Sequence, residues 1–197
     1  MKIVVIGCGK VGNEIVRLLC NEGHEITIID TKIEVVNRIV EKYDISGFVG
    51  NGASLDIQKQ AIDNKTSLVI AVTELDETNI LACVSAKKLG ASKTIARIRD
   101  HDYFKDADWL AKTFEIDLIV NPESETSLNI RNFLIFPEAL RVDVLANGKV
   151  DLVEFIIKKD NPLIGKNLYS INKEYDVKIL VCAVQRNNEV FIPCFFM

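Results

Sequence analysis

The feature that most constrains the fold is a glycine-rich motif directly after a short apolar run at the start of the chain. The run KIVVI occupies residues 2–6, and GCGKVG follows at residues 7–12. In such a motif Gly7 permits a tight turn, Gly9 lets a ligand approach the backbone, and Gly12 lets the next helix pack close to the strand. The motif therefore predicts a strand, a turn and a helix whose first turn faces an anion.

Short apolar runs continue to alternate with segments of helical period as far as about Phe136. We expect strands at residues 2–6, 25–30, 47–49, 67–72, 93–98 and 117–120. This alternation is typical of a parallel sheet joined by crossover helices. The sequence therefore predicts an α/β fold, a Rossmann-like doubly wound parallel sheet, for residues 1–136.

The pattern changes after Pro137 to short strands separated by turns. Asn147-Gly148 and Asn187-Asn188 are turn signals between apolar runs, and a short helix is expected around residues 165–171. Residues 137–197 are therefore predicted to form a second, smaller α+β module. Its apolar last residues, PCFFM, have no following turn, charge or cap. We therefore expect that the module is incomplete or that further polypeptide chain completes it.

An acidic residue stands at the predicted end of the second strand. A carboxylate at this place in a GxGxxG unit accepts hydrogen bonds from an adenosine ribose, so Asp30 is the expected ribose ligand, with Thr31 beside it. The backbone amides of Lys10 and Val11 are expected to face a phosphate. Asp30 should repel a 2′-phosphate, which favours NAD(H) or an adenine nucleotide over NADP(H). The alternative is a purely structural turn in which Asp30 caps the next helix.

Two further loops are expected at the same edge of the sheet. GNGAS follows the third strand, and its Asn51 and Gly52 are expected beside the adenine. The alternative for this loop is a simple turn with Ser54 as a helix N-cap. Thr73 and Glu74 follow the fourth strand and are expected to line the far half of the ligand.

Charge and hydropathy exclude two classes of partner. The chain has 24 Lys and Arg against 28 Asp and Glu, a net charge of −4, which does not attract nucleic acid. A membrane span needs about 20 apolar residues, and the longest uncharged stretch, residues 45–55, contains polar residues and glycines. The N-terminus has no signal-peptide pattern. We expect a cytoplasmic protein without direct membrane insertion.

Neither cysteine nor histidine indicates catalysis or metal binding. The five cysteines are odd in number and form no CxxC or Cys/His cluster, so reduced, mostly buried thiols are expected rather than disulfides or zinc. The two histidines, His24 and His101, fall in expected turns. A dehydrogenase needs a proton donor or acceptor beside its cofactor. The sequence shows none, so binding without catalysis is the expected activity and the protein is not expected to be an enzyme.

The order and spacing of several segments closely resemble the TrkA/RCK family, the nucleotide-binding cytoplasmic regulators of bacterial potassium uptake channels. These segments are MKIVVIGCGKVG, the Asp30-Thr31 pair, GNGAS, AVTELDETNILACVSAKKLG, KTIARIRDHDYF and DLIVNPE. Residues 71–90 are the most specific part. Residues 141–168 also resemble the start of the family's C-terminal (TrkA-C) module. The typical family polypeptide has two such halves in tandem, whereas this chain stops within the first.

The resemblance implies site residues by position. Those that match the family's phosphate loop are Gly7, Cys8, Gly9, Lys10 and Val11. Asp30 matches the ribose carboxylate, and Thr73 with Glu74 matches contacts after the fourth strand. Arg97 matches an arginine associated with ligand binding, and Arg99 is expected two residues later on the same strand face. A strand arginine can hold a phosphate; the alternative for Arg97 is an ion pair with Asp100 or Asp102.

The resemblance also implies function and partners. The ligand would be NAD(H) or ATP/ADP, and the partner a membrane potassium channel subunit like TrkH or KtrB at the inner face of the cell membrane. Two copies would pair through residues 122–136 and the dimers would assemble into a ring. The apolar side chains expected to serve this pairing are Leu128, Phe133, Leu134 and Phe136. The alternative is an NAD-dependent oxidoreductase subunit or a redox sensor.

Overall fold

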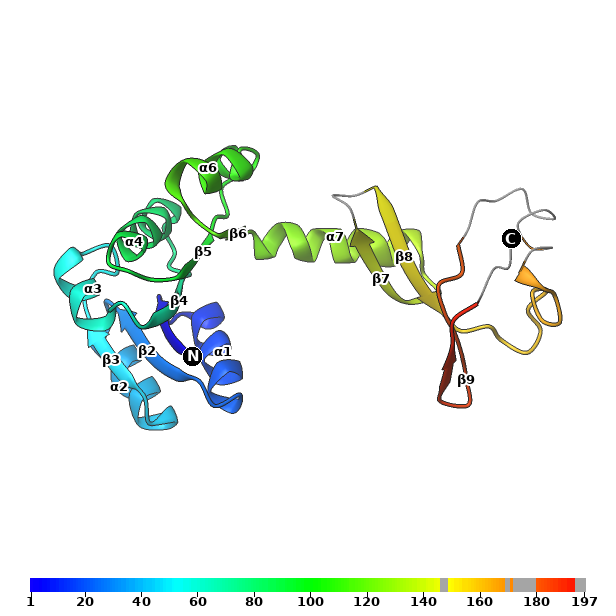
Figure 1. Ribbon diagram of the computed structural model, residues 1–197, viewed down its shortest axis with the longest axis horizontal. Helices are drawn as coiled ribbons and strands as arrows, with labels where there is room; N and C mark the ends of the chain where they lie inside the picture. The colour runs from blue at the N-terminus through cyan, green and yellow to red at the C-terminus, as the bar shows by residue number, and fades with distance from the viewer. Residues whose placement is uncertain (146–148, 169–170, 172–179, 194–197) are drawn as a thin grey trace. The chain divides into compact units, whose positions relative to one another are not determined.

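The computed structural model of the chain describes residues 1–145, 149–168, 171 and 180–193 (Figure 1). The chain divides into two compact units, residues 1–128 and 129–197. This division lies inside α7 (Pro122–Ile135), whereas the sequence predicts a domain boundary at Phe136, directly after that helix. The boundary at Phe136 stays a prediction. No helix in the described part of the chain is long and apolar enough to cross a membrane.

The first unit is built on a parallel sheet of six strands, all of them within the described residues. The strands are β1 (Lys2–Ile6), β2 (Glu25–Asp30), β3 (Ser46–Val49), β4 (Thr66–Ala71), β5 (Lys93–Arg97) and β6 (Leu118–Val120). Their order in the sheet is β3-β2-β1-β4-β5-β6, and every neighbouring pair is parallel. The predicted doubly wound sheet is therefore confirmed, and each predicted strand is correct to within one residue at either end.

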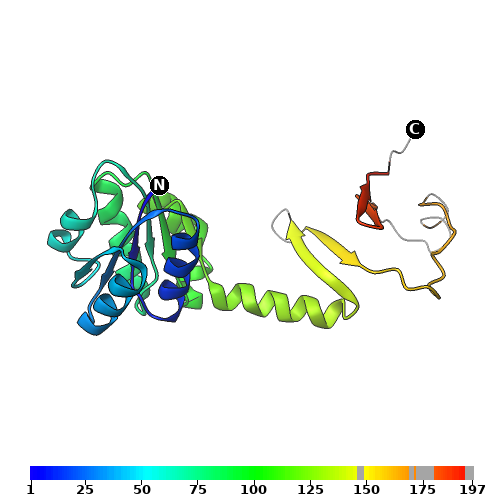
Figure 2. The same cartoon turned by 90° about the horizontal axis from the view of Figure 1, so that it is seen from below.

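Helices cover both faces of this sheet (Figure 2). The helices between the strands are α1 (Lys10–Asn21), α2 (Ile33–Tyr43), α3 (Leu55–Ala61), α4 (Asp76–Lys88), α5 (His101–Phe104) and α6 (Ala107–Phe114), whereas α7 follows the last strand and runs away from the sheet. Successive side chains of a strand point to opposite faces. In β1, Ile3 and Val5 are therefore buried in the cluster that contains residues of α1 and α2, whereas Val4 and Ile6 are buried in the cluster that contains residues of α3 and α4. A strand buried on both faces reads as an unbroken apolar run.

The second unit contains two antiparallel strand pairs in its described residues. β7 (Ala139–Leu145) pairs with β8 (Val150–Phe155), and β9 (Val184–Arg186) pairs with β10 (Glu189–Phe191). Asn187 and Asn188 join β9 to β10 with φ of 49° and 66°. A two-residue hairpin turn of type I′ requires positive φ at both positions, so the predicted turn is confirmed. The predicted turn at residues 147–148, residues 169–170 of the predicted helix and residues 194–197 lie outside the described residues. Of the rest of the predicted helix at 165–171, residues 168 and 171 are helical and residues 165–167 are not.

Candidate functional site

The sheet order brings the loops after β1, β2, β4 and β5 together at the carboxyl edge of the sheet. β1 lies in the centre, between β2 and β4, and the chain direction of the crossovers reverses there. In open parallel sheets, ligands bind at this edge, where the strand order reverses. Every site residue predicted from the sequence ends or follows one of the strands β1 to β5 and so belongs to this edge.

Two of the three glycines in the first loop are required by packing. Gly7 has φ +90°, and a Cβ on it would lie 2.7 Å from the backbone nitrogen of Thr73. A Cβ on Gly12 would lie 1.9 Å from the carbonyl oxygen of Gly7. Both contacts are with backbone atoms, which cannot move aside as a side chain can. Gly7 therefore packs the first loop against the loop after β4, and Gly12 packs α1 against the first loop.

Gly9 differs from its two neighbouring glycines because it faces open space. A Cβ built on Gly9 meets no atom of the described residues within 4 Å. Gly9 is also the N-cap of α1, and no side chain among the described residues caps this helix. The first helical hydrogen bond is donated by Asn13 to the Gly9 carbonyl, at 2.9 Å. The backbone N–H groups before Asn13, in the first turn, have no acceptor within a helix, which leaves them to an anion.

Asp30 lies at the end of β2, beside this first loop. Its Oδ2 accepts a hydrogen bond from the backbone N–H of Cys8 at 2.7 Å, and its Oδ1 accepts one from that of Lys32 at 2.9 Å. The carboxylate therefore joins the first loop to the start of α2, as in the structural alternative considered for this residue. An ionised carboxylate has about four acceptor positions, so these two bonds leave capacity for sugar hydroxyls.

Cys8 is a structural member of the first loop. Its side chain is buried, and burial together with the neighbouring Asp30 carboxylate raises the pKa of the thiol to about 12. A thiol with so high a pKa is not a nucleophile at neutral pH. Cys8 therefore contributes its backbone N–H and its volume to the site.

The loop after β3 packs against the end of β1. A Cβ on Gly52 would lie 2.0 Å from Cγ2 of Ile6, and Asn51 Oδ1 accepts a hydrogen bond from the Ala53 N–H at 2.9 Å. Gln58, on α3 and fully buried, donates from Nε2 to the Gly52 carbonyl at 2.7 Å and to the Ala82 carbonyl at 3.0 Å. Ser54 is the N-cap residue of α3, but its side chain forms no capping hydrogen bond.

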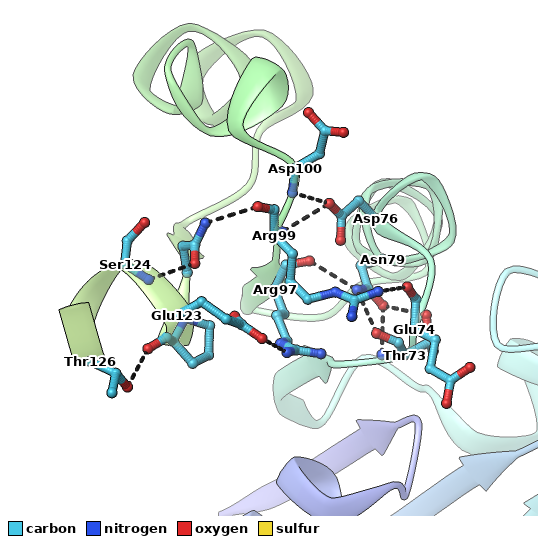
Figure 3. Close-up of polar contacts among 12 residues, drawn as sticks. Thr73, Glu74, Asp76, Asn79, Arg97, Arg99, Asp100, Glu123, Ser124 and Thr126 are labelled. Carbon is cyan, nitrogen blue, oxygen red and sulfur yellow. Dashed lines mark hydrogen bonds and ion pairs between the residues drawn. The ribbon is translucent and has the colours of Figure 1, made fainter.

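A buried asparagine connects the loop after β4 to the end of β5 (Figure 3). Asn79, on α4, accepts at Oδ1 from the backbone N–H and the hydroxyl of Thr73, at 2.8 and 2.7 Å. Its Nδ2 donates to the carbonyl of Arg97 at 2.9 Å. The three residues therefore form one polar network, and Gly7 packs against its Thr73 end.

Arg97 is nearly buried, with 9% of the residue exposed. Its guanidinium forms an ion pair with the carboxylate of Glu123, in the first turn of α7. Its Nε is buried and has no hydrogen-bond partner among the described residues. The expected alternative of an ion pair with Asp100 or Asp102 is therefore wrong, because the partner is Glu123 of α7.

Arg99 lies beyond the end of β5, so it does not share a strand face with Arg97 as the sequence analysis expects. Its backbone N–H and that of Asp100 both donate to Oδ2 of Asp76, at 2.8 and 2.7 Å. Its guanidinium donates to the backbone carbonyl of Glu74 (Figure 3). The N–H groups of Arg99 and Asp100 therefore bond to the carboxylate of Asp76 and not to a neighbouring strand.

Several residues that organise the edge are not predicted from the sequence. They are Gln58, Asp76, Asn79 and Glu123. One signal was available for two of them: Gln58 and Asn79 are polar residues at positions of α3 and α4 that face the sheet, and a buried amide requires hydrogen-bond partners. The spacing of apolar residues along a helix does not reveal which groups are the hydrogen-bond partners of Gln58 and Asn79.

The fold and the glycine loop define a Rossmann-like α/β domain. The family model of the TrkA-N domain matches residues 3–122. The chain therefore belongs to the TrkA-N domain family, as the resemblance in the sequence indicates.

Curated relatives carry potassium uptake names. The chain is 33% identical over 200 residues to "Trk system potassium uptake protein TrkA homolog 2" of Methanosarcina mazei, an alignment that covers 98% of this chain and 44% of the relative. It is 32% identical over 196 residues to "Trk system potassium uptake protein TrkA" of Halomonas elongata, with 98% and 43% covered. The chain thus spans less than half of the length of these relatives.

Solved structures share the fold at low sequence identity. The TrkA-N domain of the inner membrane protein ybaL from Escherichia coli has a TM-score of 0.59 at 18% identity, covering 68% of this chain and 96% of that one. An AMP-bound Kef C-terminal domain from Shewanella denitrificans has a TM-score of 0.58 at 16% identity, covering 70% and 81%. The GsuK channel bound to NAD has a TM-score of 0.51 at 13% identity, covering 60% and 21%.

Proposed function

We propose that this chain is the nucleotide-binding part of a potassium uptake regulator. It binds NAD(H) or ATP/ADP at the carboxyl edge of the sheet and controls a membrane potassium channel subunit like TrkH or KtrB. One observation carries the proposal: Gly9 faces open space at the uncapped start of α1, while the Asp30 carboxylate lies against the same loop. A phosphate fits the first feature and a ribose the second.

The ligand class follows from what this edge offers. The loop N–H groups suit a phosphate and Asp30 suits ribose hydroxyls, and NAD and the adenine nucleotides all carry both groups. Two proteins of similar fold were solved with AMP and with NAD, which supports a ligand that contains adenosine monophosphate. Under this proposal the residues of the site are those predicted from the sequence, with Cys8 acting through its backbone.

The proposed role is binding and regulation rather than catalysis. Of the two histidines, His24 lies in the turn before β2, beside Glu22, and His101 begins α5. Neither contacts the loops that follow β1, β2 and β4 in the hydrogen bonds and ion pairs described above. The names of the curated relatives, which describe potassium uptake, favour a transport role over an oxidoreductase.

The proposed assembly is a pair of copies that joins others in a ring. The apolar residues on α7 that are more than two-fifths exposed are Leu128, Ile130, Phe133, Leu134 and Ile135. Exposed apolar side chains in this number on one helix are available for a protein contact. Pairing through α7 would cover it, and the pair would then act on the channel subunit from the inner face of the membrane.

Calorimetric titration with NAD, NADH, ATP, ADP and NADP tests the binding proposal. We expect binding of at least one ligand without a 2′-phosphate, and weaker or no binding of NADP. A gene deletion that left potassium uptake unchanged would contradict the regulatory role. Oxidation of NADH with a small-molecule acceptor, followed at 340 nm, would instead support the oxidoreductase alternative.

A further inference from the structure

The ion pair between Arg97 and Glu123 joins two side chains in different environments. The Arg97 side chain is 11% exposed, whereas that of Glu123 is 55% exposed. A carboxylate that is more than half in water regains most of its hydration when it leaves its partner, but a nearly buried guanidinium does not. Arg97 therefore always needs an anion, and Glu123 is an anion that can leave at low cost.

Arg97 also keeps unused capacity for hydrogen bonding. A guanidinium has five N–H donors in a planar fork, and Nε of Arg97 is buried without a partner among the described residues. A phosphate group can accept from two donors of the fork at once. A single carboxylate oxygen of Glu123 contacts Arg97, through one terminal nitrogen.

The polar network of Asn79 connects this arginine to the first loop. The Arg97 carbonyl accepts from Asn79, which in turn accepts from Thr73, and Thr73 packs against Gly7. Arg97 and the glycine loop therefore belong to one continuous edge of the same unit, of which Figure 3 shows Arg97, Asn79 and Thr73. Its guanidinium is held on this edge by packing and by Glu123.

We propose that Glu123 stands in for a nucleotide phosphate on Arg97 and that the bound nucleotide displaces it. This inference rests on the proposed function and adds its regulation. Glu123 belongs to the first turn of α7, the helix within which the two units divide. Exchange of the carboxylate for phosphate releases this turn from the end of β5. The Ser124 N–H donates to Asn121 Oδ1 at 2.9 Å, so Glu123 holds the first turn of α7 to Arg97 and does not itself cap the helix.

The test is the affinity of the whole chain for ATP in two matched variants. Glu123→Gln removes the competing charge, and Glu125→Gln removes the same charge from the same helix turn, at an exposed residue. We expect Glu123→Gln to bind ATP about tenfold more tightly than wild type, the scale of one charge-assisted contact, and Glu125→Gln to bind it like wild type. Adenosine, measured by competition, should not distinguish the variants because it has no phosphate.

Each outcome has a defined meaning. Equal or weaker ATP binding by Glu123→Gln, relative to Glu125→Gln, overturns the proposed displacement while leaving nucleotide binding intact. Absence of ATP and NAD binding by the wild type overturns the proposed function, and the displacement with it. A tighter Glu123→Gln variant that gains equally for adenosine also overturns the displacement, because the gain would then not depend on phosphate.

Hydrogen–deuterium exchange tests the release of α7. In the wild type, ATP should speed exchange in the peptide that contains residues 124–128. In Glu123→Gln the same amides should exchange fast before ATP is added, and ATP should change them little. Unchanged or slower exchange in the wild type on adding ATP overturns the release of α7.

Discussion

Asn79 donates a hydrogen bond of 2.9 Å to the backbone carbonyl of Arg97, and this contact joins α4 to the end of β5. The same side chain accepts from the backbone and the hydroxyl of Thr73. One fully buried amide thus holds the loop after β4 and the end of β5 in a fixed arrangement. The position of Arg97 is therefore a property of the network and not of β5 alone.

We expect Asn79→Leu to destabilise the first unit by about 3 kcal/mol, because it leaves the Thr73 N–H and the Arg97 carbonyl buried without partners. Urea unfolding followed by circular dichroism measures this loss. Asn79→Asp keeps an acceptor for Thr73 and should lose less stability than Asn79→Leu. If Asn79→Leu were as stable as wild type, Asn79 would not be needed to hold the loop after β4 against the end of β5.

The glycines of the first loop should separate binding from folding. We expect Gly9→Asp to abolish nucleotide binding, because a carboxylate would lie where the phosphate is proposed, with little loss of stability since Gly9 faces open space. Gly12→Ala should instead destabilise the unit by about 2 kcal/mol or more, because its Cβ meets the Gly7 carbonyl.

Calorimetry and thermal unfolding together check these two variants, with Gly9→Ala as the control that adds a Cβ without charge. Loss of folding in Gly9→Asp, or wild-type stability in Gly12→Ala, would show that the roles assigned to the two glycines are wrong.

We expect Asp30→Ala to lower the affinity for NAD or ATP by about tenfold or more, the scale of hydrogen bonds to a charged group. The variant also loses the two backbone contacts to Cys8 and Lys32, so thermal unfolding without ligand must be measured beside the titration. Asp30→Asn retains an acceptor and is the matched control for the charge. Affinity unchanged in Asp30→Ala would remove Asp30 from the site.

Buried thiols should resist alkylation. Burial raises the pKa of Cys8 and of Cys83 to about 12, so at pH 8 only about one thiol in ten thousand is ionised. Cys182 is exposed. Treatment with iodoacetamide at pH 8 and peptide mass spectrometry should find Cys182 modified while Cys8 and Cys83 remain free. Equal labelling of Cys8 and Cys182 would indicate that the first loop opens in solution.

Asp117 should make stability depend on pH. Partial burial opposes its ionisation, but hydrogen bonds from Lys87 Nζ and the Thr94 N–H outweigh this and lower its pKa. Because the folded pKa lies below the unfolded one, the carboxylate stabilises the fold above about pH 4. This contribution is lost as the pH falls through the folded pKa.

We expect Asp117→Asn to cost about 1 kcal/mol at pH 7, a value kept small because the side chain is about one-third exposed. The difference from wild type should shrink as the pH is lowered below 4. Urea unfolding at pH 7 and pH 3.5 measures both. Glu115→Gln, at the exposed ion pair with Lys88, is the control and should change stability less at either pH.

The sequence by itself determined the sheet, the placement of the glycine loop and the family. The spacing at which apolar residues recur distinguishes a buried strand from an amphipathic helix within a short segment. The runs that form β1 and β2 can therefore be recognised without knowing which strands lie beside them. The requirement for glycine at Gly7 and Gly12 also follows from a short motif. The ligand roles of Asp30 and the other site residues, and the domain boundary at Phe136, stay predictions.

Only the tertiary structure decided which side chains meet at the carboxyl edge. Glu123 lies 26 residues after its partner Arg97, and Asn79 lies 18 residues before the carbonyl to which it donates. Such contacts depend on how the sheet orders its strands and where each crossover helix begins, which no local period encodes. Arg99 shows the same limit, because its N–H and that of Asp100 donate to a distant carboxylate, Asp76, just beyond the strand that the sequence extends to residue 98.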